Sequence, residues 1–417
     1  MKSILNDGVS LRFELRQLAI ALIITGAALG MYLNFFVDNL GWNNIIIVFS
    51  MIFLPNWTQL KSFKLPSVDI NFVILLFFQC LCVFYLSLSE LATGLSRGQL
   101  YIFHLFVVAF IISVMSLKSI DINFNIIIKY SWLLTFICTI LCFVCCVSGI
   151  YYIEEAKMHN GTGDESVLSP LTMTGACVTN ILCCLFVKSE RKSVIWARFI
   201  SVILSVICLF LVGKRTPLLV SILIVMIYAW RTSKFKLRIK KKYVIYLFLS
   251  IVCICLLFSD DTIRDTVYYL FERSFDGIHD MIYGTSKSGD AAVMRFRARQ
   301  WTYDLIETKF DLFNYIFGYG YMTRWLDNPV LQAYLDMGLI GFFVYFGYVI
   351  VYPIIILFSK ISRNRFVLFI SLLGCYNIFS AFNSGHPYVY TKWWTVIILI
   401  FVVKYCYAQY GKTDYYL

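Results

Sequence analysis

Long apolar runs recur along the whole chain, and each has about the length that a helix needs to cross a bilayer. The runs are about 17 to 25 residues long, and a helix needs roughly 20 residues to cross about 30 Å of hydrocarbon. They lack the even alternation of apolar and polar residues that marks the strands of a membrane β-barrel. Hydrophobic residues make up 60% and charged residues 14% of the 417 positions, and the mean hydropathy is +0.76. The sequence therefore predicts an all-α polytopic membrane protein.

The apolar runs divide into twelve predicted spans. The first run is of full spanning length and lacks a convincing small-residue cleavage site, so we expect it to be kept as a span. An even number of spans places both termini on one side of the membrane. The predicted spans begin near Leu18, Asn43, Ile70, Gln99, Ile126, Pro170, Val194, Pro217, Tyr243, Pro329, Phe366 and Trp393.

Lysines and arginines gather in alternate connections between these spans. The excess of basic residues in short loops marks the cytoplasmic side, which places both termini in the cytoplasm. The basic run at 231–242 supplies much of the net charge of +12. Anionic headgroups of membrane lipids are the expected partner of these residues, and nucleic acid is not. The basic connections carry Lys2, Arg12, Arg16, Lys61, Lys64, Lys118, Lys188, Arg191, Lys192, Lys360, Arg363 and Arg365.

The short connection GKRTP, residues 213–217, is an exception on the opposite side. Lys214 and Arg215 lie there between two apolar runs, where the charge rule expects few cations. Charges at a helix boundary indicate a functional site. The alternative is that both side chains reach out to lipid headgroups.

The only long predicted loop, residues 259–328, lies on that same outer side. We expect three parts: residues 1–258 with spans one to nine, the loop at 259–328, and residues 329–417 with the last three spans. In the loop, Arg295, Arg297 and Arg299 alternate along the chain, and we expect them to lie side by side and bind an anion. From Arg297 to Ile316 the pattern predicts one amphipathic helix on the membrane face. The alternative is that single arginines pair with acids of the loop.

Glycines and a polar pair follow this predicted helix. Gly318 and Gly320 allow a tight turn, and Gly338 and Gly341 allow close packing of the tenth span. Asp327 with Asn328 stands at the mouth of that span, just before Pro329, which suits the first turn of a helix. Asp327 is a candidate for chemistry, and the alternative is a neighbour of a helix cap.

Four motifs together resemble the superfamily of O-antigen polymerases (Wzy) and O-antigen ligases (WaaL). These are Arg215 in a short outer loop, the RxxxW segment at 297–301, the GxG at 318–320, and DNxxLxxxLDMGLIG at 327–341. The resemblance implies a GT-C-like glycosyltransferase of the bacterial inner membrane whose active site faces the periplasm. Its substrates would be oligosaccharides linked to undecaprenyl pyrophosphate, and a chain-length regulator would be a plausible partner. Ligases usually have His where this chain has Asp327, so the resemblance favours the polymerase.

The residue types fit that chemistry. Guanidinium groups bind phosphate oxygens in pairs, so Arg215 and Arg297 are the expected pyrophosphate ligands. Asp327 is the expected base for the acceptor hydroxyl. Further contacts with pyrophosphate or glycan are expected from Lys214, Arg295, Arg299, Asn328, Tyr321 and His386. Alternatives for the base are His386 and the acids Glu154, Glu155, Asp164 and Glu165 of the second outer loop.

No metal and no cofactor is expected. The chain has no DxD motif, and its histidines, His104, His159, His279 and His386, have no ligand spacing. The fourteen cysteines fall inside apolar runs, so packing is favoured over disulfides, and this includes the CxxC at Cys142 and Cys145. Aromatic residues such as Tyr319, Trp325, Trp393 and Trp394 suit either sugar stacking or a membrane-interface belt.

Two other functions are left open. An O-antigen ligase would use the same donor. A polysaccharide flippase or transporter would place charges in broken helices near the midplane, often in two related halves. The sequence shows no internal repeat, and its few charges within spans, Lys129, Asp336 and Lys404, are placed nearer the ends. We therefore expect a glycosyltransferase.

Overall fold

The computed structural model describes ten ranges or single residues of the chain and consists there of helices without β-strands. The described residues are 2–37, 40–62, 64–92, 96–153, 168–232, 276, 279, 283, 290–383 and 385–410. They form two compact units: Met1–Val225 with Asp311–Leu417, and Met226–Phe310. The predicted ninth span at Tyr243 lies outside the described residues, and so does the part of the predicted loop before residue 290, apart from 276, 279 and 283.

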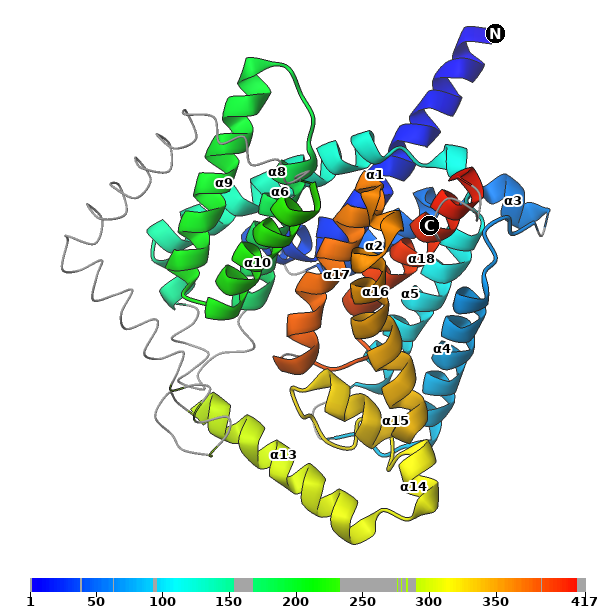
Figure 1. Cartoon of the computed structure of the whole chain (residues 1–417), viewed down its shortest axis with the longest axis vertical. Coiled ribbons are helices and arrows are strands. Elements are labelled where there is room, and N and C mark those ends of the chain that lie inside the picture. Colours follow the sequence, from blue (N-terminus) through cyan, green and yellow to red (C-terminus); the bar gives the residue numbers. More distant parts are fainter. Residues whose placement is uncertain are drawn as a thin grey trace, which may run out of the picture. The chain divides into compact units, whose positions relative to one another are not determined.

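The helices of the first unit follow the predicted spans closely (Figure 1). Eleven of the twelve predicted starts fall on described residues, and each of these lies inside a helix or within three residues of the first residue of a helix. The remaining start, Tyr243, lies outside the described residues. The helices are α1 (Lys2–Phe36), α2 (Trp42–Phe53), α3 (Trp57–Lys61), α4 (Ile70–Leu88), α5 (Arg97–Met115), α6 (Phe124–Val147), α8 (Pro170–Phe186), α9 (Lys192–Val212), α10 (Arg215–Thr232), α14 (Leu312–Phe317), α15 (Pro329–Tyr345), α16 (Tyr352–Phe358), α17 (Arg365–Asn383) and α18 (Tyr390–Tyr410). Helix α10 begins in the first unit and ends in the second.

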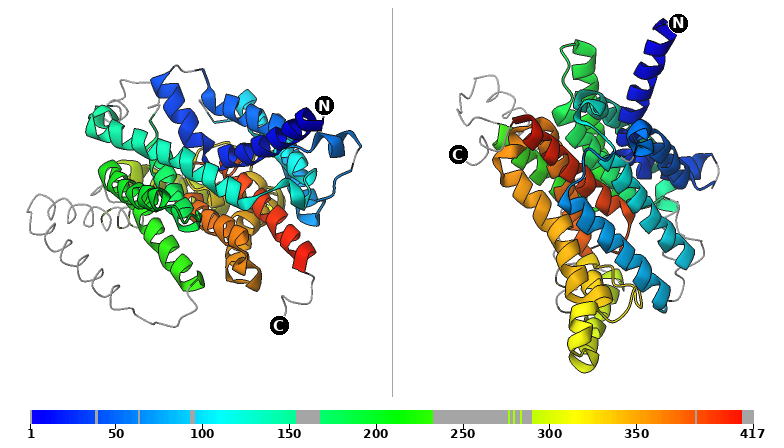
Figure 2. Two further views of the ribbon diagram at one scale, coloured as in Figure 1. Left: turned by 90° about the horizontal axis from the view of Figure 1, so that it is seen from above. Right: turned by 90° about the vertical axis from the view of Figure 1, so that its right-hand side faces the viewer.

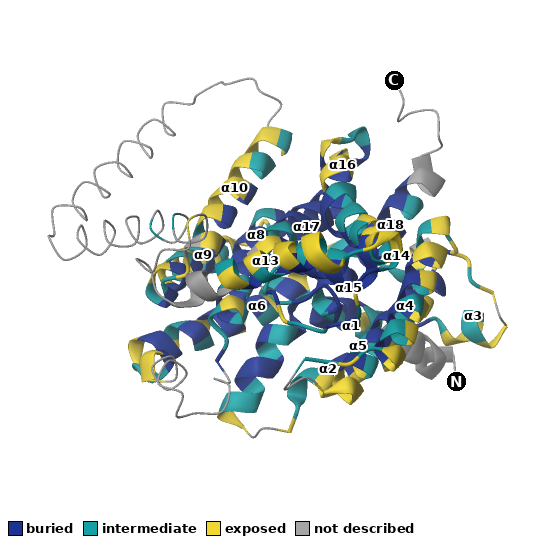
Figure 3. Ribbon diagram, turned by 90° about the horizontal axis from the view of Figure 1, so that it is seen from below, coloured by how far each residue is buried: buried dark blue, intermediate teal, exposed yellow. Residues whose placement is uncertain are grey.

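Seven helical stretches in the described part are long and apolar enough to cross a membrane, so the chain is a multi-pass membrane protein. These stretches lie in α1, α4, α5, α6, α9, α15 with α16, and α17; α2, α8 and α10 are shorter apolar helices. The total of twelve spans stays a prediction. Large apolar side chains on the outer faces are exposed, including Phe77, Leu88 and Phe199 (Figure 3). Such faces suit contact with lipid.

Local sequence sets the helix ends. The side chain of Asp69 accepts a hydrogen bond from the backbone N–H of Asn71, and the side chain of Asn123 accepts from Asn125. At the start of α15, Asn328 is the N-cap, its side chain accepts from the backbone of Leu331 at 3.2 Å, and Pro329 is the first helical residue. Side-chain caps satisfy backbone donors that have no partner inside the helix. The predicted role of Pro329 is thereby confirmed.

Successive long helices of the first unit run in opposite directions, so their connections alternate between two ends (Figures 1 and 2). At one end, Arg16 forms an ion pair of 2.6 Å with Asp121, and Arg365 donates to the backbone oxygen of Phe186. We call it the basic end, because the basic connections predicted to be cytoplasmic meet there. We call the other the Asp327 end; there the hydroxyl of Tyr152 donates to the backbone oxygen of Leu211 at 2.8 Å.

Helix α18 forms the interior of this unit. It packs against α1, α4, α5, α16 and α17, and every residue from 396 to 403 is buried. Buried apolar side chains are close-packed in protein interiors, and this packing holds the neighbouring helices in one arrangement. The ends of these helices therefore present their polar residues at defined positions.

Helix α15 is broken near its middle by two residues with non-helical backbone. Met337 has φ −133° and Gly338 has φ 60° and ψ −148°, a combination that is essentially restricted to glycine. A Cβ at Gly338 would lie 2.5 Å from the backbone of Ile316, and one at Gly318 would lie 2.3 Å from the backbone of Asp336. The predicted close approach is confirmed, and it joins the turn after α14 to the break in α15.

The predicted single helix from Arg297 to Ile316 is wrong. Two helices cover this segment: α13 (Asp290–Lys309), in the second unit, and α14. Asp311 begins α14 as its N-cap, and its side chain accepts from the backbone of Asn314 at 2.8 Å. A capping aspartate favours a new helix start over a continuous helix.

Replacing Gly338 by Ala is expected to destabilise the protein. The backbone conformation costs a non-glycine residue on the order of 1–3 kcal/mol, and the added methyl group would meet backbone atoms that cannot move aside. Thermal unfolding of the purified protein in detergent should show a lower midpoint. Gly347→Ala is the control, because a Cβ there has open space within 4 Å. Equal midpoints for the two variants would contradict the close contact.

Cysteines placed at the two ends of α10 should label from opposite sides of the membrane. Lys214→Cys lies just before α10 and Thr232→Cys at its last residue, and both native side chains are exposed. Right-side-out vesicles should react with a membrane-impermeant maleimide at position 214, and inside-out vesicles at position 232, with the unmodified chain as background. The reverse pattern would place the basic end outside.

Candidate functional site

Buried polar side chains from distant parts of the sequence meet near the Asp327 end of the first unit. Polar groups inside a protein are costly unless they are hydrogen-bonded, so such a cluster indicates a specific role. The side chains come from α4, α5, α15 and the connections before α15 and α18. We call this set the polar cluster: Gln79, His104, Tyr321, Gln332, Asp336 and Tyr388, each 1% exposed or less.

His104 is the centre of one half of the polar cluster. Its Nδ1 lies 2.7 Å from Oε1 of Gln79, and its Nε2 lies 2.6 Å from the hydroxyl of Tyr321. A neutral imidazole with its proton on Nδ1 satisfies both contacts, since Nδ1 then donates to Gln79 and Nε2 accepts from Tyr321. The Tyr321 ring stacks on Tyr388 with 4.2 Å between centroids. This half ties the connection before α15 to α4 and α5.

Asp336 and Gln332 form the other half. The side-chain nitrogen of Gln332 donates to Oδ1 of Asp336 at 2.7 Å, and the oxygen of Gln332 accepts from the backbone of Leu326 at 3.1 Å. The hydroxyl of Tyr388 lies close to the Asp336 carboxyl. Neither Oδ2 of Asp336 nor the hydroxyl of Tyr388 makes a hydrogen bond of normal geometry to a described residue. The predicted placement of Asp336 nearer an end was misleading, because its carboxyl is completely buried beside the break in α15.

Both halves hold the segment that carries Asp327. Asp327 has a left-handed backbone, φ 52°, which is uncommon for a residue other than glycine. Its carboxylate accepts from the indole N–H of Trp325 at 2.7 Å and from the backbone of Gly385 at 3.3 Å. Backbone strain of this kind is concentrated at functional sites. Asp327 is half-buried and Trp325 is 42% exposed, so the carboxylate lies at the surface of the unit.

His386 lies beside this carboxylate and in contact with the polar cluster. Its ring lies 5.1 Å from that of Trp325 and 6.0 Å from that of Tyr388. Burial, with the nearby Lys392 and His104, lowers the pKa of His386 to about 3. The imidazole is therefore neutral at pH 7 and a weak proton acceptor. Its Nδ1 accepts from the backbone of Tyr388 at 3.3 Å, which leaves Nε2–H as a donor.

Lys392 adds a cation that the sequence analysis missed. The side chain is 7% exposed, and its ammonium donates to the backbone oxygen of Ser380 at 3.1 Å and to the hydroxyl of Ser380 at 3.2 Å. The carboxylate of Asp327 is close enough to interact with it electrostatically. The stretch TKWW gave only a weak signal, because a lysine in the first turn of a span is ordinarily a headgroup contact.

The predicted cations fall in both units. Arg215 is the first residue of α10. The exposed Lys214 and, before it, Gly213 with φ 69° precede it; the structure does not describe the Arg215 side chain. These residues are at the Asp327 end of the first unit. The joint contact of Arg215 and Arg297 with one pyrophosphate stays a prediction, because Arg297 belongs to the second unit.

The three loop arginines do not lie side by side as expected. All three are inside α13, where successive residues are about 100° apart around the axis. Arg295 and Arg299 are one turn apart on the half-buried face, whereas Arg297 is exposed on the other side. Buried Ala298, Thr302 and Leu305 mark the same inner face as Arg295 and Arg299. One anion would therefore contact both Arg295 and Arg299, whereas Arg297 would contact a different anion.

Several aromatic residues have roles other than those expected. Tyr321 is completely buried and bonded to His104, so it supports the site without an open face for glycan. Trp393 and Trp394 are 1% and 5% exposed, which excludes an interface belt. Tyr319 and Trp325, at 39% and 42%, are accessible for stacking on a sugar. Asn328 is half-buried and acts as the helix cap, and the alternative acids at 154–165 lie outside the described residues.

Sequence signals for the polar cluster existed but were ambiguous. His104 and Gln79 lie within long apolar runs, where each could be an isolated polar residue. Only the fold brings them against Tyr321, which lies more than two hundred residues further along the chain.

Comparisons with known proteins add no family. No family model matches the chain, and no curated protein matches it.

Replacing Tyr321 by Phe should destabilise the fold by about 1–3 kcal/mol, because Nε2 of the buried His104 would lose its partner. Tyr101→Phe is the matched control. The Tyr101 hydroxyl also makes a hydrogen bond, of 3.0 Å to Ser87, but at an exposed position. Such a change is expected to cost within about 0.5 kcal/mol. Thermal unfolding in detergent measures both variants, and equal midpoints would contradict the network.

Proposed function

We propose that this protein is an O-antigen polymerase, which joins oligosaccharide repeat units linked to undecaprenyl pyrophosphate at the outer face of a bacterial inner membrane. The observation that supports this most is the arrangement at the Asp327 end. A half-buried carboxylate is held there by an indole and a backbone N–H, next to a neutral histidine and a buried lysine. A carboxylate, an imidazole and an ammonium group thus lie together on a multi-pass membrane protein, and this supports a role in glycosyl transfer from a lipid diphosphate.

Asp327 is the proposed general base. It would take the proton from an acceptor sugar hydroxyl, whose oxygen forms the new bond to the anomeric carbon of the donor. The bond from that carbon to pyrophosphate breaks, and its electron pair leaves on the pyrophosphate oxygen. The indole of Trp325 orients the carboxylate at 2.7 Å, and an oriented base contributes about 10²- to 10⁴-fold to the rate. His386, with its lowered pKa, serves better as a hydrogen-bond donor.

The departing pyrophosphate would be stabilised by fixed cations. Lys392 is held beside Asp327, and Lys214 with Arg215 is at the same end of the first unit. At about 4 Å and an effective dielectric constant near 20, each contact between a cation and a phosphate contributes roughly 4 kcal/mol before desolvation. The expected binding of pyrophosphate by Arg295, Arg297 and Arg299 of α13 stays a prediction, because these residues belong to the second unit. An O-antigen ligase would use the same groups with another acceptor.

A flippase or transporter is a second candidate, and one observation favours it. Helix α15 is broken at Met337 and Gly338 next to the buried carboxyl of Asp336. Transporters bind substrates and ions at broken helices of this kind. The break is filled by the turn at Gly318, however, so it supports the Asp327 segment.

Asp327→Asn should abolish chain growth in a strain whose own gene for this protein is deleted. The amide keeps the shape of the side chain but cannot accept the proton, so a loss of about 10²-fold or more is expected. The readout is the ladder of long lipopolysaccharide at matched protein levels. Asp69→Asn, at the N-cap of α4 and the basic end, is the control. A normal ladder from Asp327→Asn would exclude it as the base.

Arg215→Ala should shorten or remove the same ladder, since loss of one fixed charge-stabilising group costs about 10²- to 10³-fold. Arg231→Ala, at the other end of α10, is the matched control and should leave the ladder intact. The uncomplemented deletion strain separates the functions. Lipopolysaccharide with a single repeat indicates a polymerase, and a bare core indicates a ligase or flippase instead.

A further inference from the structure

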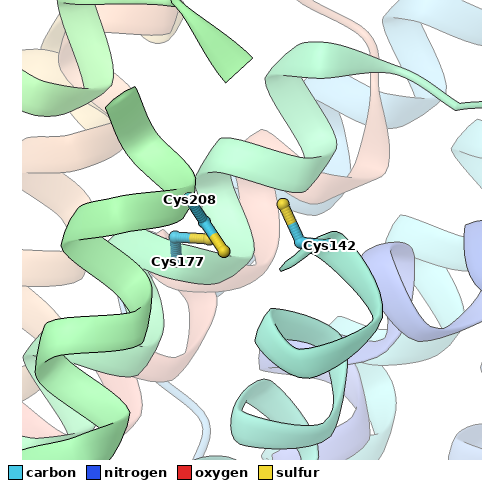
Figure 4. A group of neighbouring side chains, drawn as sticks. All are labelled: Cys142, Cys177 and Cys208. Carbon is cyan, nitrogen blue, oxygen red and sulfur yellow. The ribbon is translucent and has the colours of Figure 1, made fainter. Parts of the chain in front are cut away.

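Three cysteine side chains from three different helices meet inside the first unit. They are Cys142 of α6, Cys177 of α8 and Cys208 of α9, and Figure 4 shows their sulfurs turned toward one another. All three Sγ atoms lie within 4.8 Å of one another, and all three side chains are completely buried. The group has no part in the site at Asp327. The CxxC spacing of Cys142 with Cys145 did not indicate it, because its other members come from other helices.

Packing alone does not explain the surroundings of these thiols. Tyr32 of α1 is 1% exposed and lies against Cys142 and Cys177. Its hydroxyl makes no hydrogen bond of normal geometry to a described residue and lies close to the sulfur of Cys142. A buried hydroxyl without a well-placed partner costs about 1–3 kcal/mol, whereas phenylalanine would fill the space without that cost. A polar hydroxyl is therefore directed at a group of three convergent sulfurs.

The donor set selects the kind of ion. Sulfur donors favour soft metals, and carboxylate or carbonyl oxygens, which Mg²⁺ and Ca²⁺ require, are not among the three donor atoms. A structural Zn²⁺ takes four ligands at the corners of a tetrahedron, whereas three sulfurs suit an ion that takes three ligands. With metal–sulfur bonds of about 2.3 Å, such sulfurs are about 4 Å apart, within the observed limit.

The three helices pack with one another, so a metal ion held by the three sulfurs would join them. Metal-bound cysteines are thiolates, so binding of the ion releases the thiol protons to solvent.

We propose that Cys142, Cys177 and Cys208 form a binding site for a monovalent soft metal ion, Cu(I). The site links α6, α8 and α9 at one point, so metal binding stabilises this part of the bundle. It is independent of the proposed glycosyl transfer and takes no part in that reaction.

The test is titration of the purified full-length protein, with its thiols reduced, against Cu(I) held by bicinchoninate. One Cu(I) per chain should move from the coloured complex to the protein. Cys142→Ser, Cys177→Ser and Cys208→Ser should each weaken this binding at least tenfold. Cys406→Ser is the matched control, because Cys406 is as buried but lies on α18. Failure to take up Cu(I), or an equal loss in the control, would overturn the proposal.

X-ray absorption on the copper-loaded wild-type protein gives a second readout that no variant can confound. It should show sulfur neighbours alone, at about 2.3 Å. A shell of nitrogen or oxygen would place the copper elsewhere and overturn the assignment. Thermal unfolding without copper checks that the serine variants fold. The midpoint of each variant should match that of Cys406→Ser.

Discussion

The contact between the backbones at Gly318 and Gly338 determines the shape of the Asp327 end. Two segments approach so closely that a single Cβ on either would meet backbone atoms at 2.3 to 2.5 Å. The approach lets the backbone N–H of Tyr319 donate to the oxygen of Leu335 at 2.8 Å. Once this contact is made, residues 319–328 must run across the mouth of α15. Tyr321 then reaches His104, and Leu326 reaches Gln332. The half-buried Asp327 is thus fixed by contacts that lie beneath it.

Charge is distributed very differently over the two ends of the first unit. Cations at the basic end are numerous and belong to short connections, which is typical of the cytoplasmic side. Cations at the Asp327 end are few, and one of them, Lys392, is almost completely buried. A basic residue in contact with water is stable without an anionic partner. A buried ammonium group destabilises the fold unless nearby groups compensate its charge. Ser380 and Asp327 provide that compensation, which makes Lys392 part of the site.

The apolar runs predicted the helices well because a membrane span has to satisfy its backbone hydrogen bonds internally. Pro329, Asn328 and the glycines at 318 and 338 were recognisable too, since each has a conformational property of its own. The polar cluster could not be predicted, because His104, Gln79 and Tyr388 acquire their partners only through contacts between helices that are distant in sequence. The prediction of a single helix from Arg297 was wrong. The helical spacing of apolar residues continues across Asp311, but the Asp311 side chain caps the start of a new helix. The arginines alternated in sequence, but a helix turns alternate residues to different faces.

The central claim is that a lipid-diphosphate glycan is extended at the Asp327 end. The most direct measurement uses the purified chain in liposomes, with undecaprenyl-pyrophosphate-linked repeat units as the only substrate and mass spectrometry of the products. The account predicts lipid-linked glycan of two or more repeats, together with undecaprenyl pyrophosphate in an equal number to the new bonds. The account would be contradicted if the repeat units crossed the bilayer without being joined, or if they stayed unreacted in liposomes that contain the folded protein.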